Sequence, residues 1–399
     1  MLSLKNLLTP KIKKNIKKFL HILYRLRYNK STVQTSLLFT EIGQKNSDIF
    51  FGYYDICPFD IKDSKLLFIR RINSGKENKE VLISYKELST DTTIEIAKSY
   101  AWNWQQGSRL RWLTESEISF NDFRDGNYCN RIINIFTREE RRLSYPLYDI
   151  SENKKLGVSL DFERLGSLRP GYGYTCQKSI LDNYGDDGIK VIDIVNNKII
   201  LDLPLTYFHK LMNSQRSLDL CYINHLSFNP DSSHFLFFWI EIINNYHKAS
   251  LVVYNMNTKQ LKILESELKV SHYVWEDNNN IICTAYTSPN ECKYYRYSVD
   301  SGQKETIAEN ILDRDGHPSF INNVEIITDT YPDKNGYQSL FKFNLKNNTK
   351  VDILKIYSAP TELGEHRTDL HPRLNHQKSM VCIDARVKKN RKIYLIQLI

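Results

Sequence analysis

Seven similar segments follow one another along the chain, and this repetition limits the possible folds more than any other feature of the sequence. Each segment opens with a short motif, continues through a polar turn and ends in a hydrophobic run. The segments span residues 52–69, 101–122, 145–160, 223–239, 271–286, 316–331 and 369–385. Their spacing of roughly 40 to 50 residues is the period of a β-propeller blade.

Most of the chain has the pattern of strands and turns. Short apolar runs such as KLLFIRRI and FLFFWIEI alternate with Asn, Asp, Gly, Ser or Pro, and the 25 Tyr and 18 Phe also favour strands. We therefore predict an all-β fold, a seven-bladed β-propeller over residues 35–399, in which TSLLFTEIG at 35–43 completes the C-terminal blade. A two-sheet sandwich is the alternative, which the serial repeat disfavours.

The leader, residues 1–34, differs from the rest in charge and periodicity. Residues 1–30 contain nine Lys or Arg and no acid, so 55 − 9 = 46 basic residues remain against 46 acidic ones and the body is formally neutral. The stretch KIKKNIKKFLHILYRLRY predicts a short basic amphipathic helix, which is typical of contact with a membrane surface. A solvated helix packed against the body and a partly disordered leader are the alternatives.

Charge, cysteines and hydropathy exclude several classes of protein. A neutral body argues against nucleic-acid binding. The seven cysteines are scattered without a C-x-x-C spacing, which favours a reducing compartment, and no run of 18 apolar residues predicts a transmembrane helix. We expect a cytoplasmic protein, with peripheral contact to the inner membrane through residues 1–30 as an option. The oligomeric state is not indicated.

Four histidines occupy corresponding places in four successive segments. They are His225 in NHLSF, His272 in SHYVW, His317 in GHPSF and His371 in DLHPR. In a propeller these side chains would converge at one end of the central channel, where imidazoles can bind a divalent metal ion. Asp315, Asp369 and Gln106 are candidate outer partners. The alternative is four histidines that serve only in packing.

Residues 161–174, DFERLGSLRPGYGY, combine two arginines and two tyrosines with three glycines and a proline. We predict a rigid loop that presents these side chains, because glycine permits unusual backbone angles and proline stiffens a turn. An Arg fork suits a carboxylate, and a Tyr can stack on a sugar or move a proton. Alternatively, the arginines pair with nearby acids and the tyrosines pack between blades. The side chains concerned are Arg164, Arg169, Tyr172 and Tyr174.

Read in order, the motifs GYYDICPFD, WNWQQG, DFERLGSLRPGYGY, NHLSF, SHYVW, DGHPSF, TDTYPD and RTDLHPR resemble a known family. The resemblance is to the seven-bladed β-propeller polysaccharide lyases of the ulvan lyase type and, more distantly, to the oligogalacturonate lyases. It covers roughly residues 48–399. It implies β-elimination on a uronate-containing polysaccharide or oligosaccharide, in which a cation neutralises the carboxylate while a base removes the neighbouring proton.

The resemblance also implies roles for individual residues. Tyr148 would be the general acid or base and Arg164 the carboxylate clamp. Substrate-binding residues would be Asn103, Gln105, Gln106, Arg169, Tyr172 and Tyr174. The pattern departs from these lyases in the second blade, because no His occurs between residues 24 and 208. A non-catalytic glycan-binding or scaffolding propeller in bacterial capsule or O-antigen synthesis is therefore the alternative, and a protein-interaction propeller is a third.

Overall fold

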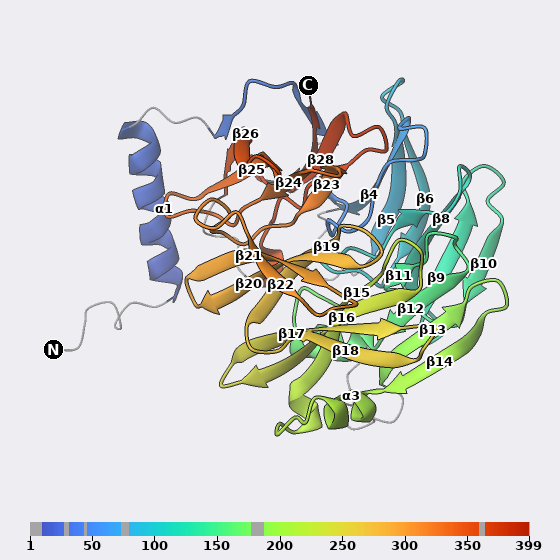
Figure 1. The fold of residues 1–399 in the computed structure, drawn as a ribbon. Helices are drawn as coiled ribbons and strands as arrows, with labels where there is room; N and C mark the ends of the chain where they lie inside the picture. Colours follow the sequence, from blue (N-terminus) through green and yellow to red (C-terminus); the bar gives the residue numbers. More distant parts are fainter. Residues whose placement is uncertain are drawn as a thin grey trace.

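Seven antiparallel sheets follow one another around a ring in the computed structural model (Figure 1). The structure describes residues 10–27, 32–43, 46–72, 80–176, 187–358 and 364–398. The predicted all-β seven-bladed propeller is confirmed, and six of the seven repeated segments supply the first two strands of one blade. The exception is segment 52–69, which begins after the first strand of blade 1 and contributes to the second. The chain adds three α-helices to the ring among its described residues: α1 (Pro10–Arg27), α2 (Phe162–Leu168) and α3 (Leu205–Leu211).

The first four blades each contain four strands that are consecutive in the chain. Blade 1 has β3 (Ser47–Phe50), β4 (Lys65–Ile72), β5 (Val81–Glu87) and β6 (Thr93–Ser99). Blade 2 has β7 (Arg111–Trp112), β8 (Glu117–Arg124), β9 (Asn127–Asn134) and β10 (Glu140–Leu143). Blade 3 has β11 (Asp149–Ile150), β12 (Leu156–Leu160), β13 (Gly188–Asp193) and β14 (Lys198–Pro204). Blade 4 has β15 (Cys221–Phe228), β16 (His234–Ile243), β17 (Tyr246–Asn255) and β18 (Gln260–Glu265).

Blade 5 also has four consecutive strands, whereas blades 6 and 7 each include a strand from near the N-terminus. Blade 5 has β19 (Lys269–Trp275), β20 (Asn280–Ser288), β21 (Glu291–Ser298) and β22 (Lys304–Ile307). Blade 6 has β23 (Ser319–Asn322), β24 (Glu325–Asp329), β25 (Tyr337–Asn344), β26 (Thr349–Tyr357) and β1 (Val33–Gln34). Blade 7 has β27 (Arg373–Leu374), β28 (Met380–Ala385), β29 (Lys392–Gln397) and β2 (Phe39–Ile42).

The polar turn of the repeat has a common structure. In four blades the first side chain of the turn accepts a hydrogen bond from the backbone N–H five residues later, at distances of 2.6 to 2.9 Å. The accepting residues are Asp60, Ser151, Asn229 and Asn375. Such side chains replace a backbone partner in a tight turn. The Asn, Asp and Ser of the repeat therefore fix the connection between the first two strands of a blade.

The ring closes between the two ends of the propeller. Strand β2 pairs with β29, with Phe39 opposite Ile396 and Ile42 opposite Ile393, as predicted for the segment 35–43. Strand β1 adds a fifth strand to blade 6 by pairing with β26. Residues 33 and 34, which the sequence assigned to the leader, thus lie in a propeller sheet.

The predicted leader helix is present as α1, which lies at the rim of the ring beside blade 6 (Figure 1). Residues 1–9 and 28–31 of the leader lie outside the described residues. No helix in the described part of the chain is both long enough and apolar enough to cross a membrane.

The stretch at 161–174 begins with helix α2, where the sequence predicted a loop throughout. Asp161 caps the helix, because its side chain accepts a hydrogen bond from the backbone N–H of Arg164 at 2.8 Å. The chain then turns at Gly171 and Gly173, which have φ of 95° and 68°. A side chain at position 173 would meet the carbonyl oxygen of Phe162 at 2.4 Å, so only glycine fits there.

Candidate functional site

The four repeated histidines converge at one end of the central channel. All four are buried, and their ring centroids lie 4.1 Å apart for His272 and His317, 4.4 Å for His317 and His371, and 6.1 Å for His225 and His272. Tyr53 lies among them, with its hydroxyl 2.6 Å from Nε2 of His225 and its ring 4.9 Å from that of His371. We call the face of the propeller at this end the site face. It carries the loops 100–106, 169–174, 330–336 and 364–369.

Irregular backbone aims two of these histidines into the channel. The register of β15 shifts between Asn224 and Ser227, and that of β19 shifts between Val270 and Tyr273, so His225 and His272 each lie in a bulge. A bulge redirects a side chain that a regular strand would point elsewhere. His225 also has a left-handed φ of 60°. Strained backbone of this kind concentrates at functional sites in proteins.

His317 and His371 have one ring nitrogen occupied and the other without a partner. Nδ1 of His317 lies 2.8 Å from Oδ1 of Asp329, and Nδ1 of His371 lies 2.8 Å from the carbonyl oxygen of Gly52. Both acceptors hold a proton on Nδ1, so Nε2 carries the lone pair in the neutral imidazole. Although burial acts in the opposite direction, Asp329, Asp369 and Asp315 raise the pKa of His317, so a cation at its Nε2 would displace a proton from the imidazolium. Among the described residues, neither Nε2 has a hydrogen-bond partner although both atoms are buried. Ligand atoms of His317, His371 and Asp369 lie within 4.8 Å of one another.

This arrangement fits a divalent cation. Two imidazoles and a carboxylate are ligands for first-row divalent metals, and histidine ligands are normally oriented by an acceptor on their other nitrogen. Asp369 also forms an ion pair with Arg367, at 2.6 Å between Nη2 and Oδ2. The pKa of Asp369 is lowered, because Arg367 and His317 outweigh the effect of burial. Asp369 therefore offers a carboxylate rather than a carboxylic acid.

His272 forms a pair with Asp315 that differs from these ligands. Its Nδ1 lies 2.9 Å from Oδ1 of Asp315. The same carboxylate accepts hydrogen bonds from the hydroxyl of Thr284 at Oδ1 (2.7 Å) and from that of Ser271 at Oδ2 (2.6 Å). Burial would raise the pKa of Asp315, but His272 and the two hydroxyls hold it far below its usual range. Burial lowers the pKa of His272. The imidazole is therefore neutral near pH 7, with its lone pair on Nε2.

Two cations on the site face form no direct ion pair in the described part of the chain. They are Arg169, whose guanidinium lies 5.5 Å from the ring centre of Tyr172, and Lys269, whose ammonium lies 5.5 Å from that of Tyr286. Burial and the charge of Arg169 lower the pKa of Lys269 and outweigh the opposite effect of Asp315, so the two cations act on each other. Burial and the same two charges lower the pKa of His247 to about 4. An anion at this place would relieve the repulsion.

The predicted amide residues are buried and join the loops of the site face. Asn103 donates to the carbonyl oxygen of Gly173 at 2.9 Å and accepts from the backbone N–H groups of Gln105 and Gln106. Gln105 donates to the carbonyl oxygen of Arg367 at 2.7 Å. The Oε1 atoms of both glutamines are buried without a hydrogen-bond partner among the described residues. These amides connect blades 2, 3 and 7 around the mouth.

Tyr148, one of the two predicted catalytic residues, lies in the wall of the channel. The side chain is fully buried, and its hydroxyl accepts from Nε2 of Gln106 at 2.6 Å and donates to Oδ1 of Asn224 at 3.1 Å. The guanidinium of Arg109 lies 4.1 Å from its ring centre. Burial raises the pKa of Tyr148 strongly, so the phenol stays protonated. Its implied role as base stays a prediction that this geometry does not favour.

Arg164, the predicted carboxylate clamp, is buried between α2 and blade 4. Its guanidinium forms an ion pair with Asp187 and donates to the carbonyl oxygens of Leu218 (3.3 Å) and Cys221 (3.2 Å). Only 4% of the residue is exposed. As a clamp it would have to leave these partners, so the free guanidinium of Arg169 is the better candidate.

The two predicted tyrosines separate. Tyr172 lines a cavity of about 480 Å³ on the site face, together with Asn103, Trp102 and Trp104. Its ring also lies 6.4 Å from those of Tyr53 and His225, which places the cavity beside the histidines. Tyr174 is buried, stacks on Phe162 with ring centroids 4.5 Å apart, and accepts from Asn121 at 2.9 Å. Tyr172 therefore belongs to the candidate site, whereas Tyr174 packs in the interior of the propeller.

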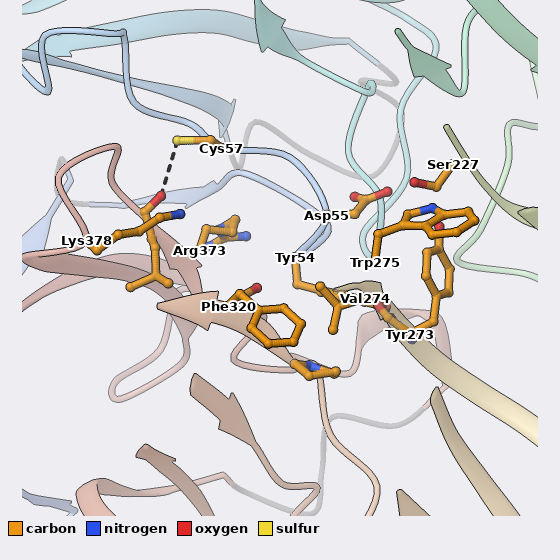
Figure 2. A pocket seen from close by; sticks show the side chains of 13 residues that line it. Tyr54, Asp55, Cys57, Ser227, Tyr273, Val274, Trp275, Phe320, Arg373 and Lys378 are labelled. Atoms are coloured by element: carbon orange, nitrogen blue, oxygen red, sulfur yellow. Dashed lines mark hydrogen bonds between the residues drawn. The ribbon is translucent and has the colours of Figure 1, made fainter. Parts of the chain in front are cut away.

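The opposite mouth of the channel holds a second cavity, of about 320 Å³ (Figure 2). Arg373 and Lys378 lie on one side of it, and Tyr273 and Trp275 lie on the other. Cys57 lines it, but burial raises the pKa of this thiol to about 12, so it is no nucleophile. Asp55 also lines this cavity but is held in an ion pair by Arg109, whereas the cluster of histidines lies on the site face.

Sequence reasoning missed Tyr53 and Lys269. Tyr53 stands near the start of the first repeated segment, as the histidines stand near the start of later ones, so an alignment of the repeats would have drawn attention to it. Lys269 opens strand β19, and nothing in the sequence separates it from other lysines.

Comparisons with known proteins support the fold. No family model and no curated protein matches the sequence. Among solved structures, an oligogalacturonate lyase in complex with manganese is similar at 13% identity, with 92% of this chain and 94% of that chain covered and a TM-score of 0.67. The oligogalacturonate lyase of Vibrio parahaemolyticus is similar at 12% identity, with 92% of this chain and 96% of that chain covered and a TM-score of 0.65. The tricorn protease is similar at 11% identity, with 89% of this chain but 34% of that chain covered and a TM-score of 0.54. The likeness to the ulvan lyase type stays a prediction. At these identities the comparisons show one thing, that this chain has the seven-bladed propeller fold of the oligogalacturonate lyases.

Proposed function

We propose that this protein is a lyase-like enzyme that cleaves a uronate-containing polysaccharide or oligosaccharide by β-elimination on the site face. The observation that carries the proposal is the neutral His272–Asp315 pair beside the group formed by His317, Asp369 and His371. Such a site offers a base next to ligands for a cation, which is what removal of a proton beside a carboxylate requires.

His272 would be the base. Asp315 fixes the proton on Nδ1 and orients the ring, so Nε2 can accept the proton on the carbon next to the uronate carboxylate. The electron pair of that C–H bond forms the new C=C bond, and the bond from the ring to the glycosidic oxygen breaks. His272 lies 4.1 Å from His317 between ring centroids, so base and ligand group act on the same sugar.

Positive charge at the mouth would hold the carboxylate. Arg169 and Lys269 form no direct ion pair with any described residue, and Arg169 can form two parallel hydrogen bonds to a carboxylate. A divalent ion held by His317, Asp369 and His371 would add positive charge beside the same carboxylate. The manganese in the similar oligogalacturonate lyase supports this choice of ion class.

Tyr53 would protonate the leaving oxygen. Burial raises its pKa well above the ordinary value, so the phenol carries its proton at neutral pH. His225 lies 2.6 Å from the hydroxyl and orients it, but burial lowers the pKa of His225 well below its ordinary value, so this imidazole is neutral. The proton that restores the phenol would be the one that His272 has taken from the sugar, since the His272 and Tyr53 ring centroids lie 6.4 Å apart. The aromatic cavity lined by Trp102, Trp104 and Tyr172 would receive the neighbouring sugar by stacking.

The test is to incubate the protein, purified without chelator, with oligogalacturonates and with ulvan fragments. The expected product is an unsaturated uronate, measured by its ultraviolet absorbance. His272→Gln should abolish the signal. His376→Gln is the matched control, because His376 is exposed on the opposite face. No absorbance change from any acidic glycan with manganese present would contradict the proposal.

A glycan-binding propeller without turnover is the second candidate. It is favoured by the second blade, where the buried amides of Gln105 and Gln106 stand and no histidine occurs between residues 24 and 208. Calorimetry with the same oligosaccharides separates the two. Binding that Arg169→Ala weakens, without any unsaturated product, would support the glycan-binding function, for which capsule or O-antigen synthesis is the proposed setting.

We place the activity in the cytoplasm, peripherally at the inner membrane. The seven cysteines form no disulfide in the described structure, which supports a reducing compartment. The basic leader, residues 1–30, supports contact with a membrane surface. Fractionation of cells that produce the full chain would test this, and recovery of the protein outside the inner membrane would contradict it.

A further inference from the structure

The apolar side of α1 faces solvent. Phe19 is 59% exposed, Leu20 is 56% and Leu26 is 74%, and the other four large apolar residues of the stripe are all more than 40% exposed. With about 3.6 residues per turn, these positions fall on one side of the helix. The stripe consists of Ile12, Ile16, Phe19, Leu20, Ile22, Leu23 and Leu26.

The opposite side of α1 contacts the propeller. His21 lies opposite the middle of the stripe and is 4% exposed. Its Nε2 lies 3.1 Å from the carbonyl oxygen of Lys334, and its ring meets the edge of Tyr357 at a centroid distance of 5.8 Å. Gly336 makes this contact close, because a side chain there would meet Nδ1 of His21 at 2.6 Å.

This orientation is the reverse of ordinary packing. A surface helix buries its apolar stripe against the core and turns its charges outward. Here a buried histidine anchors the polar side, and the stripe is left for another partner. The exposed Lys17 and Lys18 flank the docked side, and residues 1–30 carry nine basic residues and no acid. An apolar stripe with basic flanks suits a lipid surface with anionic headgroups.

The anchor also places the site near that surface. Loop 330–336 joins β24 to β25, and β24 ends at Asp329, the partner of His317. Lys334 of this loop, together with Tyr331 and Asp315, lines a cavity of about 660 Å³ on the site face. The helix is therefore fixed to the rim of the candidate site and not to the far face of the propeller.

We propose that α1 is a docking helix that lies in the headgroup layer of an anionic bilayer and holds the rim of the site face against it. The inference deepens the membrane contact proposed above and rests on it, but not on the lyase chemistry. It assigns the substrate to acidic glycans carried at that surface, such as lipid-linked ones.

The first test measures sedimentation of the full chain with phosphatidylcholine vesicles and with vesicles that also contain phosphatidylglycerol. We expect binding only to the anionic vesicles. Phe19→Glu should lower the partition coefficient at least tenfold. Phe136→Glu is the matched control, because Phe136 is an equally exposed phenylalanine (63%) on the blade 2 turn between β9 and β10, and it should leave binding unchanged.

Equal loss with both variants, or equal binding to neutral vesicles, would overturn the proposal. So would a dimer in analytical ultracentrifugation that Phe19→Glu dissociates while vesicles are not bound, because the stripe would then cover a second copy of the chain. Product formation from soluble oligosaccharides should be the same with and without Phe19→Glu. Loss of membrane binding and loss of chemistry are thus separate results.

The second test concerns orientation. A dye is attached at His366→Cys on the site face or at His376→Cys on the opposite face, with labelling of the unsubstituted protein as background. Energy transfer to a lipid dye should be at least twofold greater from position 366. Gly336→Ala should abolish the difference while vesicle binding persists, because it displaces His21 from the rim. Equal transfer from the two positions in the unaltered chain would contradict the orientation.

Discussion

The two arcs of the ring treat their buried polar groups differently. In blades 4 to 7, His317 and His371 keep a buried Nε2 without a partner in the described structure. In blades 2 and 3, the side chains of Asn103, Gln106 and Tyr148 donate to a loop carbonyl or to another side chain, and the buried atoms left without a partner among the described residues are amide oxygens, Oε1 of Gln105 and Gln106. A buried polar atom without a partner costs stability unless something binds it. Both arcs therefore have open acceptors, but imidazole nitrogens are the better ligands for a first-row divalent ion, so we propose the histidine arc as the ion site and the amide arc as its support.

Arg164→Leu gives the largest expected effect on stability in the amide arc. It leaves Asp187 buried without its ion-pair partner, so the free energy of unfolding should fall by about 3–5 kcal/mol. Urea denaturation measures the change. If the variant is as stable as the parent chain but forms no product, Arg164 is the clamp that the sequence suggested, and the comparison of the two arcs fails.

Removal of a divalent ion tests whether the histidine arc binds one. At an ion concentration 100 times the dissociation constant, binding stabilises the fold by about 2.7 kcal/mol. A chelator should therefore lower the melting temperature of the parent chain by several degrees, and elemental analysis should find about one ion per chain lost. The double variant His317→Ala, His371→Ala should show no response to chelator. A parent chain whose melting temperature ignores chelator contradicts the proposed ion.

Arg169→Ala tests the cation that lies between the two arcs. The side chain contacts Tyr172 without an ion pair in the described chain, so its loss should cost little stability. The KM for an acidic oligosaccharide, or its Kd if there is no turnover, should rise roughly tenfold, about 1.4 kcal/mol. Calorimetry with charged and with methyl-esterified oligosaccharides tests whether the loss of affinity depends on the carboxylate charge. An equal loss for both ligands would mean that Arg169 does not hold the carboxylate.

His247 gives the smallest effect, through pH. Its pKa of about 4 in the folded chain is below the ordinary value, because burial, Arg169 and Lys269 disfavour the imidazolium. The unfolded chain therefore binds more protons between these values, and this contribution to stability is present above about pH 6.5 and lost as the pH falls to about 4. NMR titration of the imidazole should give the low pKa. His247→Gln should flatten the decline in stability over that range.

The sequence predicted the ring and the meeting of four histidines because both depend on repetition. The turn residues recur with their hydrogen bonds, and His225 and His272 lie in bulges at matching places of successive blades. Within one segment, the direction of each side chain depends on where the local helix begins and ends. Arg164 and Arg169 are five residues apart, so helix α2 turns the first towards Asp187 and leaves the second at the mouth. The residue types in this stretch do not indicate which of the two arginines faces the mouth.

The cap of α2 shows why the helix was missed. Asp161 followed by FERL is a helix start, but the glycines and proline after it predict a loop over the whole stretch. The burial of Tyr148 was equally hidden, because it depends on Arg109, Gln106 and Asn224 from other blades. Contacts between distant segments are not visible in local patterns.

The pairing of β2 with β29 sets an order of events during synthesis. Strand β29 follows every other strand along the chain, so blade 7 cannot form until nearly the whole polypeptide has left the ribosome. Residues 10–27 emerge hundreds of residues earlier, so under the proposed docking α1 would reach the bilayer before the site face exists. Closure of the ring would then take place with the N-terminal end already held, which would keep the late-forming blade at the membrane where the protein is to act.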